Sequence, residues 1–187
     1  MTRLVLASAS PRRRELLAAA GLEFDVDVAD VDERPVTGDA PPTYVLRVAR
    51  LKAEAVAARR PDRPVLGADT AVVVGQQMLA KPADALDAAR MLEQLSGRVH
   101  EVLTGVALAF RGQTYAEIDK TTVWFSKLSP EEIEWYAGSG EPLDKAGGYG
   151  IQGLASRFIP RIEGSYTNVV GLPIATVVQL LRRAGVT

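Results

Sequence analysis

Cysteine is absent from the 187 residues, and histidine occurs once, at His100. Without cysteine the chain forms no disulfide bond, no thiolate zinc site and no cysteine nucleophile. A single histidine excludes a metal site built from several imidazoles, and we expect His100 to be structural. The lack of cysteine also fits a protein that works in a reducing compartment.

An excess of either charge is lacking as well. Lysine and arginine number 22 and the acidic residues 23, which gives a net charge of −1. A protein that binds duplex nucleic acid usually carries a basic excess, because neutralised phosphates supply much of its affinity. The composition therefore argues against a nucleic-acid partner, but it leaves room for a local anion site.

Long apolar runs are missing too, since none approaches the ~18 residues that cross a bilayer. The opening stretch MTRLVLASAS has too short an apolar run for a signal peptide, and three arginines follow shortly after it. We therefore expect a cytoplasmic protein without a membrane partner. The esterase motif G-x-S-x-G and the P-loop motif G-x-x-x-x-G-K-[ST] do not occur, so neither class is supported.

Segments typical of strands and helices alternate along the chain, without a repeat or a linker. This alternation, with at least one antiparallel pair, predicts an α/β fold with a mixed sheet, in a single domain over residues 1–187. The expected strands are 4–7, 24–28, 65–68, 71–74, a hairpin of 99–110 with 114–127, and 158–163. The expected helices are 11–20, 43–59, 84–95, 130–137 and 172–183.

Four segments break the local rules of their elements, which is where functional sites tend to occur. In the first, Ser10 is typical of an N-cap and Pro11 of a first helical residue, yet Arg12, Arg13 and Arg14 then fill the first turn. Cations are disfavoured there by ~0.3–1 kcal/mol each, unless an anion binds the helix terminus. The segment is therefore either a solvated basic turn or a phosphate site.

The second is Lys52, which lies within the apolar stripe of the helix expected at 43–59. Val48 and Val56 stand one turn to either side of it. A lysine in a buried stripe either extends its ammonium to solvent or meets an anion, and the pattern leaves both open.

The third is Asp69-Thr70, which interrupts the apolar run VLGADTAVVV. Ligands of open α/β sheets gather at the carboxyl ends of strands, where a carboxylate can hold a hard cation or accept a proton from water. The alternative is a turn between two short strands that begins with an aspartate.

The fourth is the glycine-rich segment EPLDKAGGYGIQG at 141–153. It contains G-x-G-x-x-G, but no strand precedes the motif, so a dinucleotide site is rejected. The alternatives are a mobile surface loop and a loop that brings an acid–lysine pair and an amide to a ligand.

Taken together, the unusual cations suggest a pocket for a polyanion such as a nucleoside triphosphate, with carboxylates for a magnesium-like ion. The cations are Arg12, Arg13, Lys52, Lys81 and Lys145, and the carboxylates are Glu33, Asp69 and Asp144.

Five ordered segments carry a resemblance to a known family. LASASPRRRELL, GADT, AKP, EPLDKAGGYGIQG and GSYTNVVGLP, which span residues 6–173, resemble the motifs of the Maf family. The resemblance implies a nucleoside triphosphate pyrophosphatase that cleaves between the α and β phosphates. Its expected role is house-cleaning, the removal of non-standard or excess nucleotides. The resemblance further implies a strongly twisted sheet, two lobes with a cleft between them, a divalent metal (Mg or Mn) and a possible homodimer.

The resemblance also assigns roles to individual residues. Asp69 is the expected general base, and Glu33 and Asp69 are the expected metal ligands. The residues expected to bind the substrate are Ser8, Arg12, Arg13, Lys52, Thr70, Lys81, Asp144, Lys145 and Gln152.

Within the family, the resemblance favours the branch that acts on dTTP and UTP. Arg12 and Gln152 stand where a 7-methyl-GTP branch usually has tryptophan and glutamate, and Thr70 follows Asp69 at a position where that branch differs. Tryptophan suits a cationic methylated purine, whereas an amide suits a base edge with both donors and acceptors. The alternatives are that second branch and a non-enzymatic nucleotide-binding regulator of septum formation.

Overall fold

The computed structural model describes residues 3–186, so residues 1, 2 and 187 of the expected single domain lie outside the described residues. Contacts divide the chain into two compact units. The first unit contains the chain up to Thr70, Thr104–Asp119 and the chain from Gly171 onward, and the second contains Ala71–Leu103 and Lys120–Val170. No helix among the described residues is long and apolar enough to cross a membrane.

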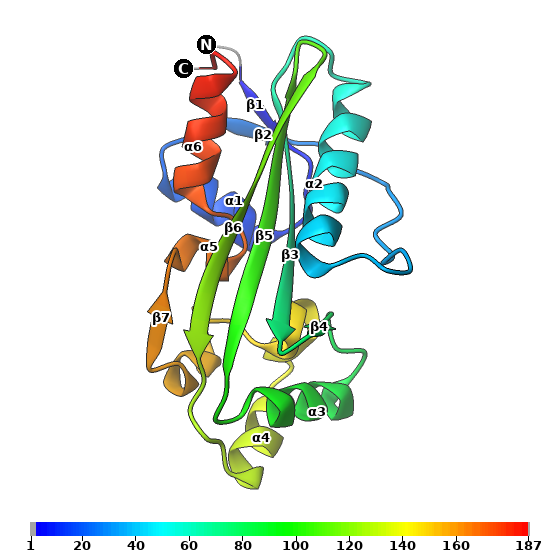
Figure 1. The fold of residues 1–187 in the computed structure, drawn as a ribbon. Coiled ribbons are helices and arrows are strands. Elements are labelled where there is room, and N and C mark those ends of the chain that lie inside the picture. Colours follow the sequence, from blue (N-terminus) through cyan, green and yellow to red (C-terminus); the bar gives the residue numbers. More distant parts are fainter. Residues whose placement is uncertain (1–2, 187) are drawn as a thin grey trace. The chain divides into compact units, whose positions relative to one another are not determined.

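Seven strands and six α-helices alternate along the described chain (Figure 1). The strands are β1 (Leu4–Leu6), β2 (Phe24–Val26), β3 (Val65–Val74), β4 (Gln77–Leu79), β5 (Val99–Phe110), β6 (Gln113–Trp124) and β7 (Arg161–Glu163). The helices are α1 (Pro11–Ala19), α2 (Pro41–Ala57), α3 (Ala85–Leu95), α4 (Pro130–Ala137), α5 (Tyr166–Val170) and α6 (Ile174–Arg183).

The strands form one mixed sheet in the order β2-β1-β3-β5-β6-β7, with β4 paired to β3. Strand β1 runs parallel to both β2 and β3, whereas β3–β4 and β6–β7 are antiparallel. A two-residue turn with positive φ at Arg111 and Gly112 joins β5 to β6, as expected for a hairpin. The predicted α/β class with a mixed sheet is confirmed.

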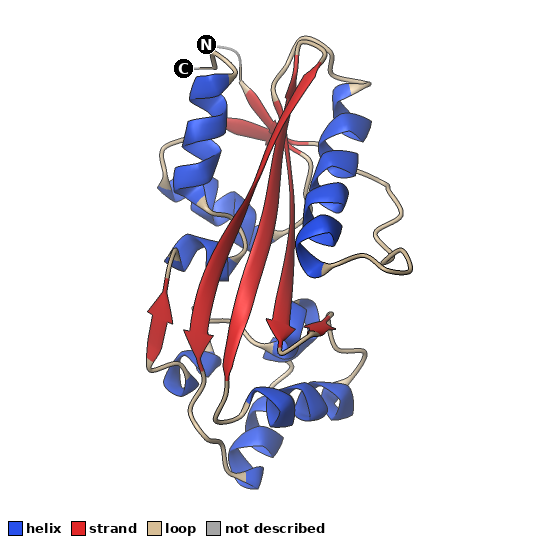
Figure 2. Cartoon of the chain, in the orientation of Figure 1, coloured by secondary structure: helices blue, strands red, loops and turns tan. Residues whose placement is uncertain are grey.

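In the first unit, helices cover both faces of the sheet (Figure 2). Side chains alternate along β1, so Leu4 and Leu6 pack toward α1 and α6, while Val5 packs toward α2. The α1 face is filled by leucines and valines such as Leu17 and Leu180, which are fully buried. This alternation decides which helix each side chain of the sheet meets.

Helix α2 approaches the sheet closely because two strands present glycine to it. A Cβ on Gly67 would lie 2.3 Å from the Ala49 carbonyl oxygen, and one on Gly105 would lie 2.4 Å from the Val45 carbonyl oxygen. Real Cβ atoms do not approach oxygen so closely, so the backbones of helix and strand are in direct contact.

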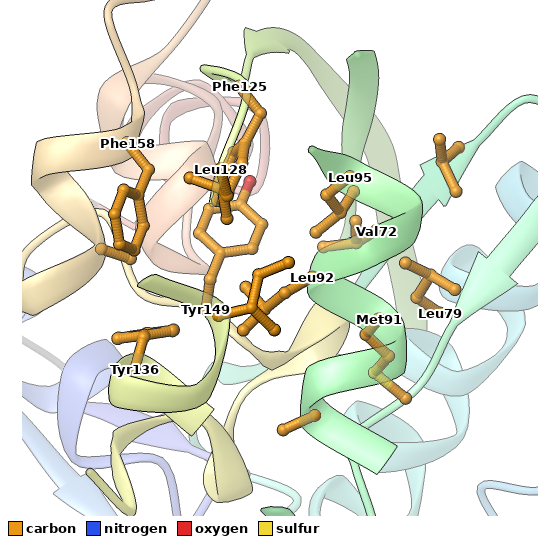
Figure 3. Packing of buried hydrophobic residues seen from close by; sticks show 14 of the residues in the cluster. Val72, Leu79, Met91, Leu92, Leu95, Phe125, Leu128, Tyr136, Tyr149 and Phe158 are labelled. Atoms are coloured by element: carbon orange, nitrogen blue, oxygen red, sulfur yellow. The ribbon is translucent and has the colours of Figure 1, made fainter. Parts of the chain in front are cut away.

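The core of the second unit lies between α3, α4 and the aromatic residues of the loops that follow (Figure 3). Leu92 and Leu95 of α3 point toward Tyr149 and Phe125 in Figure 3, and the rings of Phe125 and Tyr149 are 5.2 Å apart. His100 joins this cluster: its Nε2 lies 2.6 Å from the Tyr149 hydroxyl, and its ring is 2% exposed. It therefore has the structural position that we expected.

Several expected element boundaries were wrong. The break expected between strands 65–68 and 71–74 is wrong, as is the alternative of a turn at Asp69, because 65–74 is one continuous strand. Helix α2 begins at Pro41, two residues before the expected start, because a first helical turn has no intrahelical acceptor for its N–H groups and so tolerates proline. The glycine-rich segment folds into short 3-10 helices at 141–144 and 146–148, with a third at 154–158, and α5 was not expected.

Gly105→Ala should destabilise the protein by about 3 kcal/mol or more, since the new methyl group must displace the backbone of α2. Urea unfolding measures the change. Gly138→Ala is the control, because Gly138 has an ordinary φ of −74° and its nearest neighbour would lie at 3.2 Å. Equal effects of the two substitutions would contradict the close contact.

Acid should destabilise the protein through His100, because burial lowers the pKa of its imidazole to about 4. The unfolded-state pKa is ~6.5, so the neutral ring stabilises the fold above pH 6.5 and that contribution is lost as the pH falls toward 4. We expect a loss of about 2 kcal/mol between pH 7 and pH 5. His100→Phe, which cannot gain a proton, should lack this loss in urea unfolding at the two pH values; identical pH slopes would refute the assignment.

Candidate functional site

In the first unit, the strand that follows β1 is added on one side of it and the next strand on the other side. Helix α1 leads from β1 outward to β2, and α2 leads back across to β3 on the other side of β1. The carboxyl end of β1 beside β3 is therefore a topological switch point, where open α/β sheets bind ligands. Ser8 follows β1, and Asp69 and Thr70 lie on β3.

The first turn of α1 carries a buried arginine. Ser10 is the N-cap and Pro11 the first residue of α1, as the sequence predicted. The Arg13 guanidinium is 9% exposed and donates to the Ser8 hydroxyl at 3.1 Å, the Ala68 carbonyl at 2.8 Å and the Thr70 hydroxyl at 3.1 Å. Its Nε donates to the Gly171 carbonyl at 2.9 Å.

All four of these acceptors are uncharged, so the positive charge of Arg13 persists within the site. Burial lowers the pKa of this guanidinium, while the nearby charges of Asp69 and Glu33 raise it. A buried cation held by neutral dipoles is prepared to stabilise an anion, because its own desolvation is already compensated by hydrogen bonds.

Hydrogen bonds within the protein use the full capacity of the Thr70 hydroxyl. It accepts from Arg13, lies 3.0 Å from the Thr104 hydroxyl and donates to the Gly171 carbonyl at 3.3 Å. A hydroxyl has one donor and two acceptor sites, so Thr104 supplies the proton of the shared bond. The Thr70 hydroxyl therefore has no hydrogen-bonding site left for a ligand. Its effect is to orient Arg13, Thr104 and the Gly171 carbonyl.

On the opposite face of β3, Lys52 bridges two carboxylates. Its Nζ lies 2.9 Å from Asp69 Oδ1 and 2.7 Å from Glu33 Oε2. The side chains of Lys52 and Asp69 are 9% and 11% exposed, whereas that of Glu33 is 51% exposed. Of the two alternatives for Lys52, the structure shows the one in which a buried ammonium meets anions.

Alternation along β3 explains why the two groups remain separate. Asp69 points toward α2, which carries Lys52, and Thr70 points toward α1, which carries Arg13. The phenol of Tyr44, also on α2, has its pKa raised to about 12 by burial and by the charges of Asp69 and Glu33. One strand thus presents an acid to one helix and a hydroxyl to the other.

Glu33 and Asp69 fit a magnesium-like ion by their chemistry. Both are carboxylates held within hydrogen-bond distance of the same Nζ, and Mg²⁺ is commonly held by one or two carboxylates together with substrate phosphates. Between residues 3 and 186 there is no cluster of three or more acidic, histidine or cysteine side chains that could hold a metal unaided. The residues therefore suit an ion that arrives with phosphate ligands.

The second unit contains the remaining predicted residues. Lys81 is exposed and directly follows Ala80, whose carbonyl accepts from Gly147 N at 3.0 Å, so its segment lies beside the glycine-rich one. Lys145 Nζ donates to Asp144 Oδ1 at 2.7 Å and to the Glu141 carbonyl at 2.6 Å. Gln152 is exposed.

Glu141 holds the glycine-rich segment in shape. Its carboxylate accepts from the Tyr136 hydroxyl and from Leu154 N, both at 2.9 Å. A Cβ on Gly153 would lie 2.4 Å from this carboxylate, and one on Gly150 would lie 2.6 Å from the Lys145 side chain. A side chain at either glycine would therefore displace the end of the Glu141 or the Lys145 side chain.

Sequence reasoning found most of the polar residues in the first unit but missed those that orient them. The structure brings Ser8, Arg13 and Thr70 into one group and Glu33, Lys52 and Asp69 into another, with Arg12 adjacent in the chain. It leaves Arg14 exposed. Thr104 was missed, although a threonine inside the apolar strand β5 is a signal of the same kind as Asp69 in β3.

Comparison with known proteins identifies the family of this chain. The profile of the family described as Maf-like protein matches residues 3–184. A dTTP/UTP pyrophosphatase of Anaeromyxobacter dehalogenans (strain 2CP-C) is 56% identical over 98% of this chain and 94% of its own length. The dTTP/UTP pyrophosphatases of Myxococcus xanthus and Vibrio cholerae are 55% and 53% identical, each over 98% of this chain and over 93% and 98% of their own lengths.

Among solved structures, the Staphylococcus aureus Ham1 protein resembles this fold with a TM-score of 0.50 at 17% identity. The match covers 84% of this chain and 79% of that one, and at this identity it bears on the fold alone. The family profile and the near full-length relatives agree with one another, and the chain belongs to the Maf family.

Proposed function

We propose that the protein is a nucleoside triphosphate pyrophosphatase that hydrolyses dTTP and UTP between the α and β phosphates. The observation that carries the proposal is the buried Asp69 carboxylate, paired with Lys52 on one face of β3, while a guanidinium held by neutral acceptors lies on the other face. Three relatives that share more than half of their residues with this chain bear the name dTTP/UTP pyrophosphatase.

In the proposed reaction, Asp69 accepts a proton from a water molecule as that water attacks the α-phosphorus. The new P–O bond forms as the bond between the α-phosphorus and the bridging oxygen breaks, and pyrophosphate leaves with that oxygen. The products are the nucleoside monophosphate and pyrophosphate. Lys52 fixes Asp69 in position, as a general base requires.

The triphosphate would be held by the cations of the first unit. Arg12 and Arg13 lie in the first turn of α1, where the helix dipole favours an anion. Ser8 precedes this turn, and its hydroxyl orients Arg13 by accepting a hydrogen bond from the guanidinium. Because Arg13 is fixed before substrate arrives, it stabilises developing charge without reorganisation.

Glu33 and Asp69 would hold a divalent cation, Mg or Mn, which when bound neutralises charge on the phosphate oxygens. Glu33 is the more exposed of the two carboxylates and so the more accessible to an ion that enters with the substrate. Lys52 sets the distance between the two carboxylates by bonding to both.

Lys81, Asp144, Lys145 and Gln152 stay predicted substrate-binding residues of the second unit. Arg12, Thr70 and Gln152 are the residues proposed to select a pyrimidine base. For Thr70 the route is indirect, because its hydroxyl is fully used in orienting Arg13 and the turn at Gly171.

Asp69→Asn should lower kcat for UTP by about three orders of magnitude, since an amide cannot accept the proton. The melting temperature should change by only a few degrees, because Lys52 keeps Glu33 as a partner. Release of pyrophosphate and UMP from UTP in Mn²⁺ or Mg²⁺ measures the reaction. Near-normal turnover by the variant would remove Asp69 from the mechanism.

A panel of nucleoside triphosphates in the same assay tests the substrate. Preference for dTTP and UTP is expected. Preference for 7-methyl-GTP would place the chain in the other branch of the family. Binding of nucleotide without any pyrophosphate release would favour a regulator over an enzyme.

Lys52→Met should raise KM for UTP by roughly tenfold or more, because two carboxylates would then face the triphosphate without their cation. Initial rates over a range of UTP concentrations give the value. Lys120→Met is the matched control, since Lys120 pairs with a single exposed glutamate, Glu101. An unchanged KM and kcat in Lys52→Met would limit Lys52 to a structural role.

A further inference from the structure

The loop that carries Glu33 leads from β2 into α2 (Figure 1) and has little to hold it in place. Every side chain from Asp32 to Gly38 is exposed, so no apolar burial fixes the backbone there. An exposed loop without such burial samples many conformations, and ordering it costs roughly 1–2 kcal/mol per residue. The position of the Glu33 carboxylate therefore depends on polar contacts.

Within the loop, the Asp32 carboxylate accepts from Arg34 and the Asp39 carboxylate accepts from Val36 N. The other contacts come from α2. The Tyr44 hydroxyl donates to the Glu33 main-chain carbonyl at 2.9 Å. Further along the loop, Arg47 donates to the Arg34 carbonyl at 3.2 Å and pairs with Asp39 at 2.7 Å. Helix α2 thus holds the loop at three successive points, and the Tyr44 contact is the one at Glu33 itself.

The spacing of Tyr44 and Lys52 along α2 allows each residue to bind a different part of Glu33. Tyr44 and Lys52 are eight residues apart, so they lie on the same face of the helix, two turns from each other. Tyr44 binds the backbone of Glu33, and Lys52 binds its carboxylate. Two contacts from one helix thus hold the backbone and the carboxylate of Glu33.

We propose that Tyr44 is a positioning residue that preorganises Glu33 for a divalent cation. The inference rests on the proposed function, because it takes Glu33 as a metal ligand. Tyr44 touches neither the ion nor the substrate in this proposal. Its hydrogen bond limits the conformations of Glu33 before the ion binds, so less conformational entropy is lost on binding. Residues that orient metal ligands affect metal affinity for this reason.

The test is Tyr44→Phe, which keeps the ring and removes only the hydroxyl. Titration of the full-length protein with Mn²⁺ alone, followed by electron paramagnetic resonance, measures the affinity for the ion directly. We expect the dissociation constant to rise about 5- to 10-fold, the contribution of one neutral hydrogen bond. The Mn²⁺ concentration for half-maximal UTP hydrolysis should rise in parallel, while kcat at saturating Mn²⁺ and UTP stays near that of the wild type.

Tyr115→Phe is the matched control, because Tyr115 belongs to the same unit and its hydroxyl bonds to Gln113 at the hairpin. It should bind Mn²⁺ like the wild type. An equal loss of affinity in both variants would overturn the inference, as would wild-type affinity in Tyr44→Phe when Glu33→Gln binds Mn²⁺ weakly.

The double variant separates positioning from an independent role. If Tyr44 acts through Glu33, then Tyr44→Phe adds no further loss of Mn²⁺ affinity to Glu33→Gln; additive losses would overturn the inference. If Glu33→Gln and Asp69→Asn both keep wild-type Mn²⁺ affinity and turnover, the two carboxylates are not the metal ligands and the inference fails, whereas the proposed function fails only if the wild-type protein releases no pyrophosphate from UTP.

Discussion

A carboxylate buried in the middle of a strand must be neutralised where it lies, and the pairing of Asp69 with Lys52 meets this requirement. An isolated ionised carboxylate in such a position would cost many kcal/mol, so α2 has to place a cation opposite it. The helix reaches that position because Gly67 and Gly105 allow its backbone to contact the sheet. One electrostatic constraint thus links the composition of two strands, the placement of a helix and the geometry of the site.

The second buried cation is compensated in another way. Arg13 is surrounded by carbonyl and hydroxyl groups from the segment after β1, from β3 and from the turn at Gly171, and these bind its N–H groups without cancelling its charge. Lys52 is neutralised by acids, whereas Arg13 is solvated by dipoles. The site therefore combines an ion pair that holds the base with a positive charge that remains available to an anion, and this combination suits hydrolysis of a phosphoanhydride.

Much of the fold followed from local pattern. Ser10 and Pro11 marked the start of α1, the alternation of elements gave the mixed α/β class, and the paired apolar runs gave the long hairpin. The strand was expected to break at Asp69, because an acidic residue after four apolar ones has the same pattern in a turn and in a strand whose charge partner is distant in sequence. The cation that makes the strand possible is 17 residues away, on another element. Likewise, Thr104 gave no hint of its contact with Thr70, since nothing in either segment encodes their proximity.

By itself the sequence determined which residue types were out of place: arginines in a first helical turn, a lysine in an apolar stripe, an aspartate in an apolar run. Such violations are visible locally because propensity and periodicity are local properties. Only the tertiary structure decided which of them meet. Partnership depends on strand order, on the alternation that directs Asp69 to one helix and Thr70 to the other, and on the loop contacts that bring Glu33 to Lys52. These are relations between distant segments, and folding creates them.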